Sequence, residues 1–173
     1  GCGLKTFWDA CVNGQSGVRK LTTIDTTGLD VVIGGEALDF KREDYMERAV
    51  FRKIERFTQM AIAATKMALE DASFDMSRYN PDRVGVVIGT GVGAMIFSTK
   101  QIKRYLEGGP KRVQAQSVPR LCPHASTSWI AKVCGLHGMN YAVSTACSSG
   151  ANAIGQAMWF VRHGIMDACL AGG

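Results

Sequence analysis

Apolar residues recur along the chain at two periods, one typical of helices and one typical of buried strands. Between residues 44 and 72 they are spaced three and four positions apart, which predicts one long helix with a single apolar stripe. The stripe consists of Ile54, Phe57, Ala61, Ala64, Ala68 and Ala72. Residues 84–89 (VGVVIG) instead form a near-continuous apolar run with β-branched side chains, which predicts a buried parallel strand.

The remaining pattern predicts shorter elements on either side of this strand. Helices are expected over residues 4–14, 94–107, 126–133 and 149–163, and strands over residues 31–33, 141–146 and 166–172. Because strands alternate with helices and no tandem repeat is present, we expect an α/β layered fold with a mostly parallel sheet. The 173 residues suffice for one sizeable core and are too few for two ordinary domains.

The two ends of the sequence indicate a piece of a longer protein. The chain begins just past the position where a first strand is expected, and it stops on the strand residues LAGG. The longest candidate for a membrane span, residues 84–97, is interrupted by four glycines. No basic segment followed by an apolar one opens the sequence. The sequence therefore predicts neither a membrane-spanning helix nor a signal peptide, and no membrane as a partner.

The cysteines and the charged residues indicate the compartment and the kind of partner to expect. None of the six cysteines forms a C-x-x-C pair, which favours reduced thiols in the cytoplasm or in an organelle matrix such as that of a plastid or mitochondrion. The formal net charge is +5. Basic residues form three clusters: Arg48, Arg52, Lys53 and Arg56; Lys100, Lys103 and Arg104; Lys111 and Arg112. These clusters are either solvated helix faces or attractors of an acidic partner, and the lack of interleaved aromatic residues argues against nucleic acid.

The stretch VSTACSSGANAIGQA carries the chemistry. Cys147 stands between the predicted strand and the predicted helix over residues 149–163, with small residues around it. A thiol at such a strand-to-helix turn lies at the positive end of the helix, which favours the nucleophilic thiolate form. Unpaired N–H groups at the helix start can hold an oxyanion, as in a nucleophile elbow. The alternative is a buried structural cysteine.

Three other kinds of site are weaker hypotheses. The loop GTGVGA fits a dinucleotide-binding pattern, but the required acidic residue has only Glu107 as a candidate, in a turn after a helix. A zinc site could use Cys122, His124, Cys134 and His137, although the spacing is unusual. A cysteine hydrolase needs a histidine near Cys147, and His163 is expected more than about 20 Å away at the other end of the same helix.

Several motifs together resemble the β-ketoacyl synthases, the condensing enzymes of fatty acid and polyketide synthesis. They are TACSSGANAIGQA, FVRHGIMDACLAGG, ERFTQMAIAATKMALEDA, RVGVVIGTGVGA, GGPKRV and WDACVNGQSGVRKL. The resemblance covers nearly the whole chain and is closest to the elongating, synthase II-like type. It implies a thiolase-like layered α/β/α fold, of which residues 1–173 are the N-terminal half of a duplicated architecture, truncated at both ends.

The resemblance also implies a reaction and its residues. Cys147 matches the nucleophile that takes an acyl chain as a thioester, and its N–H matches one oxyanion donor. Val92 matches a residue against the acyl chain, and Val118 and Pro119 lie in the segment that reaches the pocket of a partner subunit. A malonyl group on the carrier then loses CO₂ and attacks the thioester. The expected partners are an acyl carrier protein and a second copy in a homodimer, with no metal and no cofactor.

Some features of the family are absent from the sequence. The resemblance places the two catalytic histidines and the activating lysine beyond residue 173, so these 173 residues alone are not expected to condense substrates. Met139, His124 and Asn152 depart from the residues that the family usually has. An alternative function is that of a non-catalytic dimerisation or carrier-binding partner, similar to a chain-length factor, although such subunits usually lack the cysteine.

Overall fold

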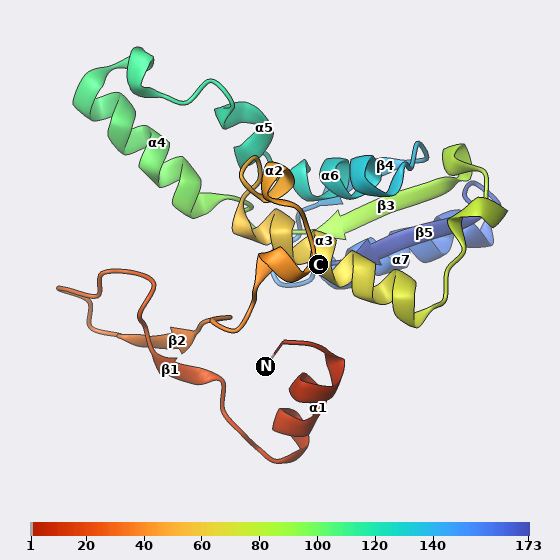
Figure 1. The fold of residues 1–173 in the computed structure, drawn as a ribbon, viewed down its shortest axis with the longest axis horizontal. Coiled ribbons are helices and arrows are strands. Elements are labelled where there is room, and N and C mark those ends of the chain that lie inside the picture. The colour runs from red at the N-terminus through yellow and green to blue at the C-terminus, as the bar shows by residue number, and fades with distance from the viewer. Residues whose placement is uncertain (1) are drawn as a thin grey trace. The chain divides into compact units, whose positions relative to one another are not determined.

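The structure, a computed structural model, describes residues 2–173 (Figure 1). The chain divides into a first unit that ends at Lys41 and a second unit, Arg42–Gly173. The described helices are α1 (Leu4–Val12), α2 (Arg48–Phe51), α3 (Arg56–Asp71), α4 (Met95–Gly108), α5 (Ser117–Leu121), α6 (Ala125–Cys134) and α7 (Ser149–Arg162). The described strands are β1 (Val18–Lys20), β2 (Ile33–Gly35), β3 (Val84–Gly89), β4 (Asn140–Val143) and β5 (Ala168–Gly172).

The first unit contains helix α1 and the two-stranded antiparallel sheet of β1 and β2. Val18 pairs with Gly35, and the Glu36 carboxylate just after β2 accepts hydrogen bonds from the backbone N–H groups of Thr22 and Thr23. These bonds lower the pKa of Glu36 to about 2, and the largest contribution comes from the Thr23 hydroxyl. A strand was predicted over 31–33, and the observed strand β2 runs from Ile33 to Gly35, so the two overlap at Ile33. Its partner β1 was not predicted.

A three-stranded parallel sheet in the order β4-β3-β5 lies in the second unit. Val86 of β3 pairs with Asn140 on one side and with Leu170 on the other. The predicted bounds of the buried strand, residues 84–89, are confirmed, and so is the parallel sheet. A central strand with neighbours on both sides and helices on both faces needs apolar residues at almost every position, which explains the unbroken run VGVVIG.

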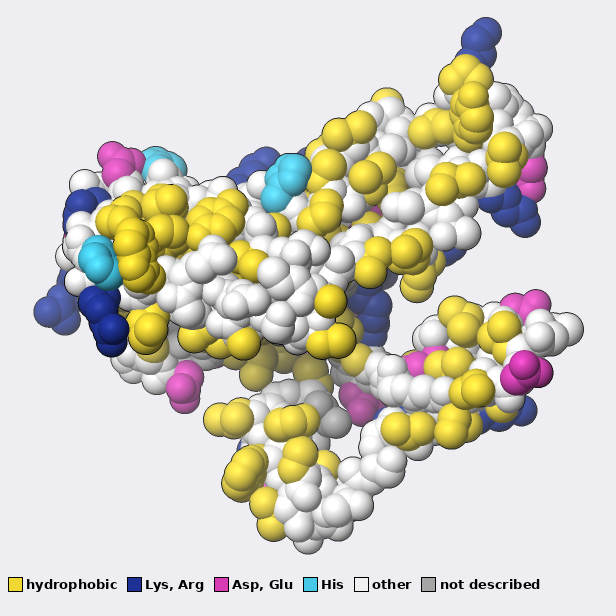
Figure 2. All heavy atoms as spheres, turned by 180° about the vertical axis from the view of Figure 1, so that it is seen from behind, with side chains coloured by type: hydrophobic (Ala, Val, Ile, Leu, Met, Phe, Trp, Pro, Cys, Tyr) yellow, Lys and Arg dark blue, Asp and Glu magenta, His cyan; other side chains and the backbone are white. Residues whose placement is uncertain are grey.

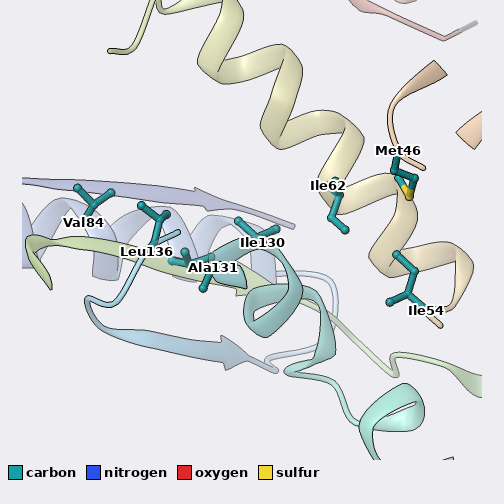
Figure 3. Packing of buried hydrophobic residues seen from close by; sticks show 8 residues of the cluster. Met46, Ile54, Ile62, Val84, Ile130, Ala131 and Leu136 are labelled. Atoms are coloured by element: carbon teal, nitrogen blue, oxygen red, sulfur yellow. The ribbon is translucent and has the colours of Figure 1, made fainter. Parts of the chain in front are cut away.

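The two faces of β3 belong to two different hydrophobic clusters because successive side chains of a strand alternate between faces. Val84 belongs to one cluster with Ile130 of α6 and Ile62 of α3 (Figure 3), and Val86 is a member of the same cluster. Val87 points to the other face, where it packs with residues of α7 that include Ala153. Helix α7 therefore covers one face of the sheet, and α6, with α3 packed on it, covers the other.

The single long helix predicted over residues 44–72 is wrong. The structure has a short helix α2, a turn, and then α3 beginning at Arg56. Ile54 is buried inside the turn, so it continues the apolar spacing without being helical. The buried Gln59 amide donates to the carbonyl oxygens of Phe51 and Ile54, which satisfies backbone groups that a continuous helix would have paired internally.

The apolar stripe of α3 lies partly over open space. A groove of about 610 Å³ separates this helix from the C-terminal ends of β3 and β5. Phe57, Ala61, Ala64 and Ala68, four members of the predicted stripe, line it. The spacing therefore predicted the correct face of the helix, but that face borders a groove instead of packing directly on the sheet.

Arg120 holds the segment that carries α4 and α5 to the start of α3 within the second unit. Its Nε donates to Glu55 Oε1 at 2.8 Å, and its guanidinium lies 4.6 Å from the centroid of the Phe97 ring. Helices were predicted over 94–107 and 126–133, and α4 and α6 confirm them, whereas the short α5 between them was not predicted. None of the helices within residues 2–173 is long and apolar enough to cross a membrane.

Candidate active site

The strand that leads to Cys147 ends earlier than predicted, at Val143 instead of residue 146. Its last carbonyl accepts a hydrogen bond from the Thr90 N–H at 2.9 Å, and the Ser144 hydroxyl donates to the Gly91 carbonyl at 3.3 Å. Both bonds join the end of β4 to the loop that follows β3. These bonds fix the point where the strand ends. The residues from Ser144 to Ser148 then form a sharp turn before α7 begins.

Ala146 carries the strain of this turn. Its φ is +52°, a left-handed conformation that costs a residue with a Cβ about 1–3 kcal/mol. The Ser149 hydroxyl bonds to the backbone before and after the strained residue: it accepts from the Thr145 N–H at 2.9 Å and donates to the Ala146 carbonyl at 2.6 Å. Ser149 is only 3% exposed, so these bonds are shielded from water and keep the turn in place.

The start of α7 lies unusually close to the ends of two strands. A Cβ added to Gly89 would lie 2.3 Å from the Ser149 carbonyl carbon, and one added to Gly173 would lie 2.7 Å from Gly150 Cα. Neither distance is possible for a real side chain, so glycines are needed for this approach. Backbone contacts among β3, the end of the chain and α7 therefore fix where the helix begins.

Cys147 lies on the outside of the turn, one residue before the N-cap Ser148 of the 14-residue helix α7. The residue is exposed, and its N–H has no acceptor among residues 2–173. The elbow predicted from the sequence is thus present, with the thiol open to solvent and a free N–H beside it. A carbonyl group attacked by the sulfur could place its oxyanion on this N–H, next to the positive end of α7.

Cys134 and Cys169 differ from Cys147 in burial. Burial raises the pKa of the Cys169 thiol to about 11 and also raises the pKa of the Cys134 thiol. Both residues contact the hydrophobic clusters at the two faces of the sheet. They are therefore structural thiols, whereas the exposed Cys147 remains the candidate nucleophile.

The three predicted substrate-binding residues lie in two places. Val92 is 61% exposed in the loop after β3, directly after Gly91, which is hydrogen-bonded to the elbow. Val118 and Pro119 are exposed on α5, which packs against α4 and α6. Val92 is thus one residue away from a hydrogen bond to the elbow, and the contacts of all three residues with an acyl chain stay a prediction.

The alternative sites of the sequence are not assembled in the structure. Glu107 lies in the last turns of α4, 3.7 Å from Lys103, and not at the end of a strand as a dinucleotide site requires. His163 is the C-cap of α7, at the opposite end from Cys147. His137 lies beside Asp82 on the surface, and residues 2–173 contain no group of three or more His, Cys, Asp or Glu side chains suited to a metal ion.

Sequence reasoning missed the side chains that hold the elbow. Thr145, Ser148, Ser149 and Asn152 form one hydrogen-bonded group around the turn. The only signal in the sequence is the density of hydroxyl and amide residues around Cys147, which favours local side-chain to backbone bonds. That signal does not tell which hydroxyl bonds to which peptide group.

Comparison with known proteins agrees with this geometry. The family model described as "Beta-ketoacyl synthase, N-terminal domain" matches residues 1–173. The chain is 38% identical over 170 residues to 3-oxoacyl-[acyl-carrier-protein] synthase 2 of Staphylococcus aureus, covering 98% of this chain and 42% of that protein. It is 31% identical to the protein of the same name from Synechocystis, covering 98% of this chain and 41% of the relative. The chain thus spans about two fifths of the length of these relatives.

Solved structures show the same fold. A β-ketoacyl synthase from Burkholderia phymatum matches with a TM-score of 0.78 and 25% identity, over 94% of this chain and 40% of that one. The ishigamide ketosynthase/chain length factor matches over 100% of this chain and 43% of that one, with a TM-score of 0.91 and 24% identity. The thiolase-like layered fold that the sequence resemblance implied is confirmed by these ketosynthase structures.

Proposed function

Since the chain belongs to the β-ketoacyl synthase family, we propose that it is the acyl-accepting half of a 3-oxoacyl-[acyl-carrier-protein] synthase. The observation that carries the proposal is the exposed Cys147 on a strained turn at the start of α7, with a free N–H beside the thiol. The reaction is the decarboxylative condensation of an acyl thioester with a malonyl-carrier protein, in fatty acid or polyketide synthesis.

The first step is an acyl transfer to this chain. The Cys147 thiolate attacks the carbonyl carbon of an acyl-carrier thioester, and the Cys147 N–H donates to the oxyanion. The bond from the acyl carbon to the carrier sulfur then breaks, and the carrier leaves as a thiol after taking up the proton that Cys147 lost. The product of this step is an acyl group bound as a thioester to Cys147.

The second step uses groups that the family resemblance places outside these 173 residues. A malonyl-carrier protein loses CO₂, its carbanion attacks the acyl carbon, and Cys147 is released as thiolate. The product is a 3-oxoacyl-carrier two carbons longer than the original acyl group. In this chain the three histidines lie at the start of α6, beside Asp82 and at the end of α7, so none hydrogen-bonds to the elbow.

Intact-mass spectrometry after incubation with an acyl-carrier thioester tests the first step. We expect one acyl adduct, which is absent in Cys147→Ala, and the cysteine-directed inhibitor cerulenin should give the same pattern. Adducts spread over several cysteines, or none on Cys147, would refute acyl transfer. A chain that binds the carrier protein without an adduct would instead fit the alternative, a non-catalytic partner like the chain length factors in two structural relatives.

The carrier protein is proposed to dock on the basic cluster at α2 and the start of α3. Arg48, Arg52 and Lys53 are exposed there, and a polyketide acyl-carrier protein is seen with its ketosynthase in one structural relative. Positive charge would steer an acidic carrier to this surface. Arg52→Glu should slow acylation by the carrier thioester about tenfold at low salt, yet leave acylation by a small-molecule thioester unchanged. Lys111→Glu, in another cluster, is the matched control.

The acyl chain is proposed to lie against Val92, the exposed residue beside the elbow. Val92→Phe should reduce acylation by a long-chain thioester and leave that by an acetyl thioester unchanged, because only the longer chain reaches the enlarged side chain. Equal rates for both chain lengths in the variant would remove Val92 from the acyl site.

For the proposed homodimer, light scattering of the purified chain should give twice the mass of 18.6 kDa.

A further inference from the structure

The Asn152 side chain reaches back from α7 to the elbow. Its Nδ2 donates to Thr145 Oγ1 at 2.7 Å and to Ser148 Oγ at 3.3 Å. Asn152 is one helical turn after Ser148, so its side chain points toward the N-terminus of α7 and lies over the turn. The amide thereby joins the residues on both sides of the pair formed by Ala146 and Cys147.

Ser148 is one of the two residues to which the Asn152 amide donates. A serine at the N-cap of a helix ordinarily accepts a hydrogen bond from an N–H of the first turn. Here the Ser148 hydroxyl makes no such cap; it donates to the Thr145 carbonyl at 2.7 Å and accepts from Asn152. The Ser149 N–H donates to the Ala146 carbonyl at 3.1 Å, so within residues 2–173 it is the Gly150 and Ala151 N–H groups of the first turn that keep their positive potential next to Cys147.

We propose that Asn152 is a positioning residue for the acyl transfer at Cys147. It holds the hydroxyls of Thr145 and Ser148 away from the helix start, so that the Cys147 N–H faces the oxyanion without competition. This inference rests on the proposed function for its catalytic consequence. Asn is suited to the task because one nitrogen carries two N–H groups that can serve two hydroxyl oxygens at once.

Two reactions at Cys147 separate this role from a merely structural one. Alkylation by iodoacetamide attacks a saturated carbon and forms no oxyanion, whereas acylation by acetyl-N-acetylcysteamine, a small thioester, does. Asn152→Leu, of similar size but without donors, should lower the acylation rate roughly tenfold more than the alkylation rate. Asn152→His, which keeps one ring N–H, should recover part of the loss.

Gln156→Leu provides the matched control. Gln156 is another exposed amide of α7, one turn further on, and it bonds to Tyr141 instead of the elbow. Its variant should leave the ratio of the two rates unchanged. An unchanged ratio in Asn152→Leu, or an equal change in Gln156→Leu, would overturn the inference.

A spectroscopic measurement keeps the test independent of the proposed function. In a ¹H–¹⁵N spectrum, Asn152→Leu should shift the amide signals of Cys147 and Ser148, and Gln156→Leu should not. If the wild-type chain takes no acyl group, the proposed function fails, but these shifts still decide whether Asn152 positions the turn. Signals that stay as in the wild type would refute the positioning role whatever the rates are.

Discussion

Gly89→Ala should displace the elbow without replacing any side chain of the candidate site. The added Cβ would lie 2.3 Å from the Ser149 carbonyl carbon, 2.4 Å from its oxygen and 2.5 Å from the Gly150 nitrogen. All three atoms are backbone atoms of the first turn of α7, so no side chain can rotate away to relieve the contact. The helix start must move instead.

The size of the effect follows from these distances. Reaching ordinary van der Waals contact requires a shift of about 1 Å, and a displacement of this size can cost about 100-fold in rate. Overpacking of this kind lowers the free energy of unfolding by about 1–3 kcal/mol. For a unit of this size, that loss lowers the thermal midpoint by roughly 3–9 °C.

Thermal unfolding by circular dichroism and the rate of Cys147 acylation measure the two effects. Gly91→Ala is the matched control, because a Cβ there meets no atom within 4 Å and φ needs no glycine. This control should melt within about 2 °C of the wild type, since exposed substitutions usually change stability by less than 0.5 kcal/mol. Equal midpoints and rates for both variants would refute the claim that close backbone approach fixes the elbow.

Three further predictions concern other parts of the chain. The Glu36 carboxylate should stabilise the β1–β2 pair above about pH 4.5 and lose this effect as the pH falls toward its pKa of about 2. The NMR shifts of the Thr22 and Thr23 amides should follow this titration, and Glu36→Gln should abolish it. Cys169, with its pKa of about 11, should react with iodoacetamide at pH 8 about 100-fold more slowly than the exposed cysteines, as peptide mass spectrometry can show. Arg120→Met should lower the free energy of unfolding by about 2 kcal/mol, because it leaves the mostly buried Glu55 unpaired, and denaturant unfolding should show partial recovery when Glu55→Met is added.

The elements that the sequence predicted well are those that bury apolar side chains in the core of the second unit. The strand over residues 84–89 has neighbours on both edges and helices on both faces, so nearly every position is apolar. Helix α7 was predicted to within one residue at its end because its buried Ala153, Ala157 and Phe160 repeat at helical spacing. Burial against the sheet requires apolar residues at a regular spacing, and this spacing can be read directly from the sequence.

The elements that it missed depend on backbone hydrogen bonds instead. The amide of Gln59 satisfies the carbonyl groups at the break before α3, and β1 is a short, exposed strand whose end is held to β2 by Glu36. Neither arrangement changes the apolar spacing. The apolar spacing therefore continues across the break at residues 52–55 and does not reveal it. The short strands β1 and β2 show no apolar–polar alternation, because neither buries a face.

Helix α7 presents a second apolar face that the core of the second unit does not use. Ile154, Met158, Trp159 and Val161 are exposed there, and hydrophobic side chains gather over this helix in the view of Figure 2. The same helix carries Cys147 at its start. A helix that is apolar on both sides is typical of one buried on both sides. Its exposed face in these 173 residues accords with a chain that spans about two fifths of its relatives' length.

The reactive residue lies inside a sequence motif, whereas two of the three residues that hold it lie outside that motif. The motif TACSSG identifies Cys147, but three other residues explain the turn that presents it. Gly89 admits the start of α7, Ser149 bonds to the Thr145 N–H and to the carbonyl of the strained Ala146, and Asn152 donates to two hydroxyls. Only the second of these lies inside the motif. Strain at a functional site persists where the surroundings over-determine it. The chain uses both a steric and a hydrogen-bonding constraint on the same turn, so that relaxing either one alone leaves the other to limit how far the thiol moves.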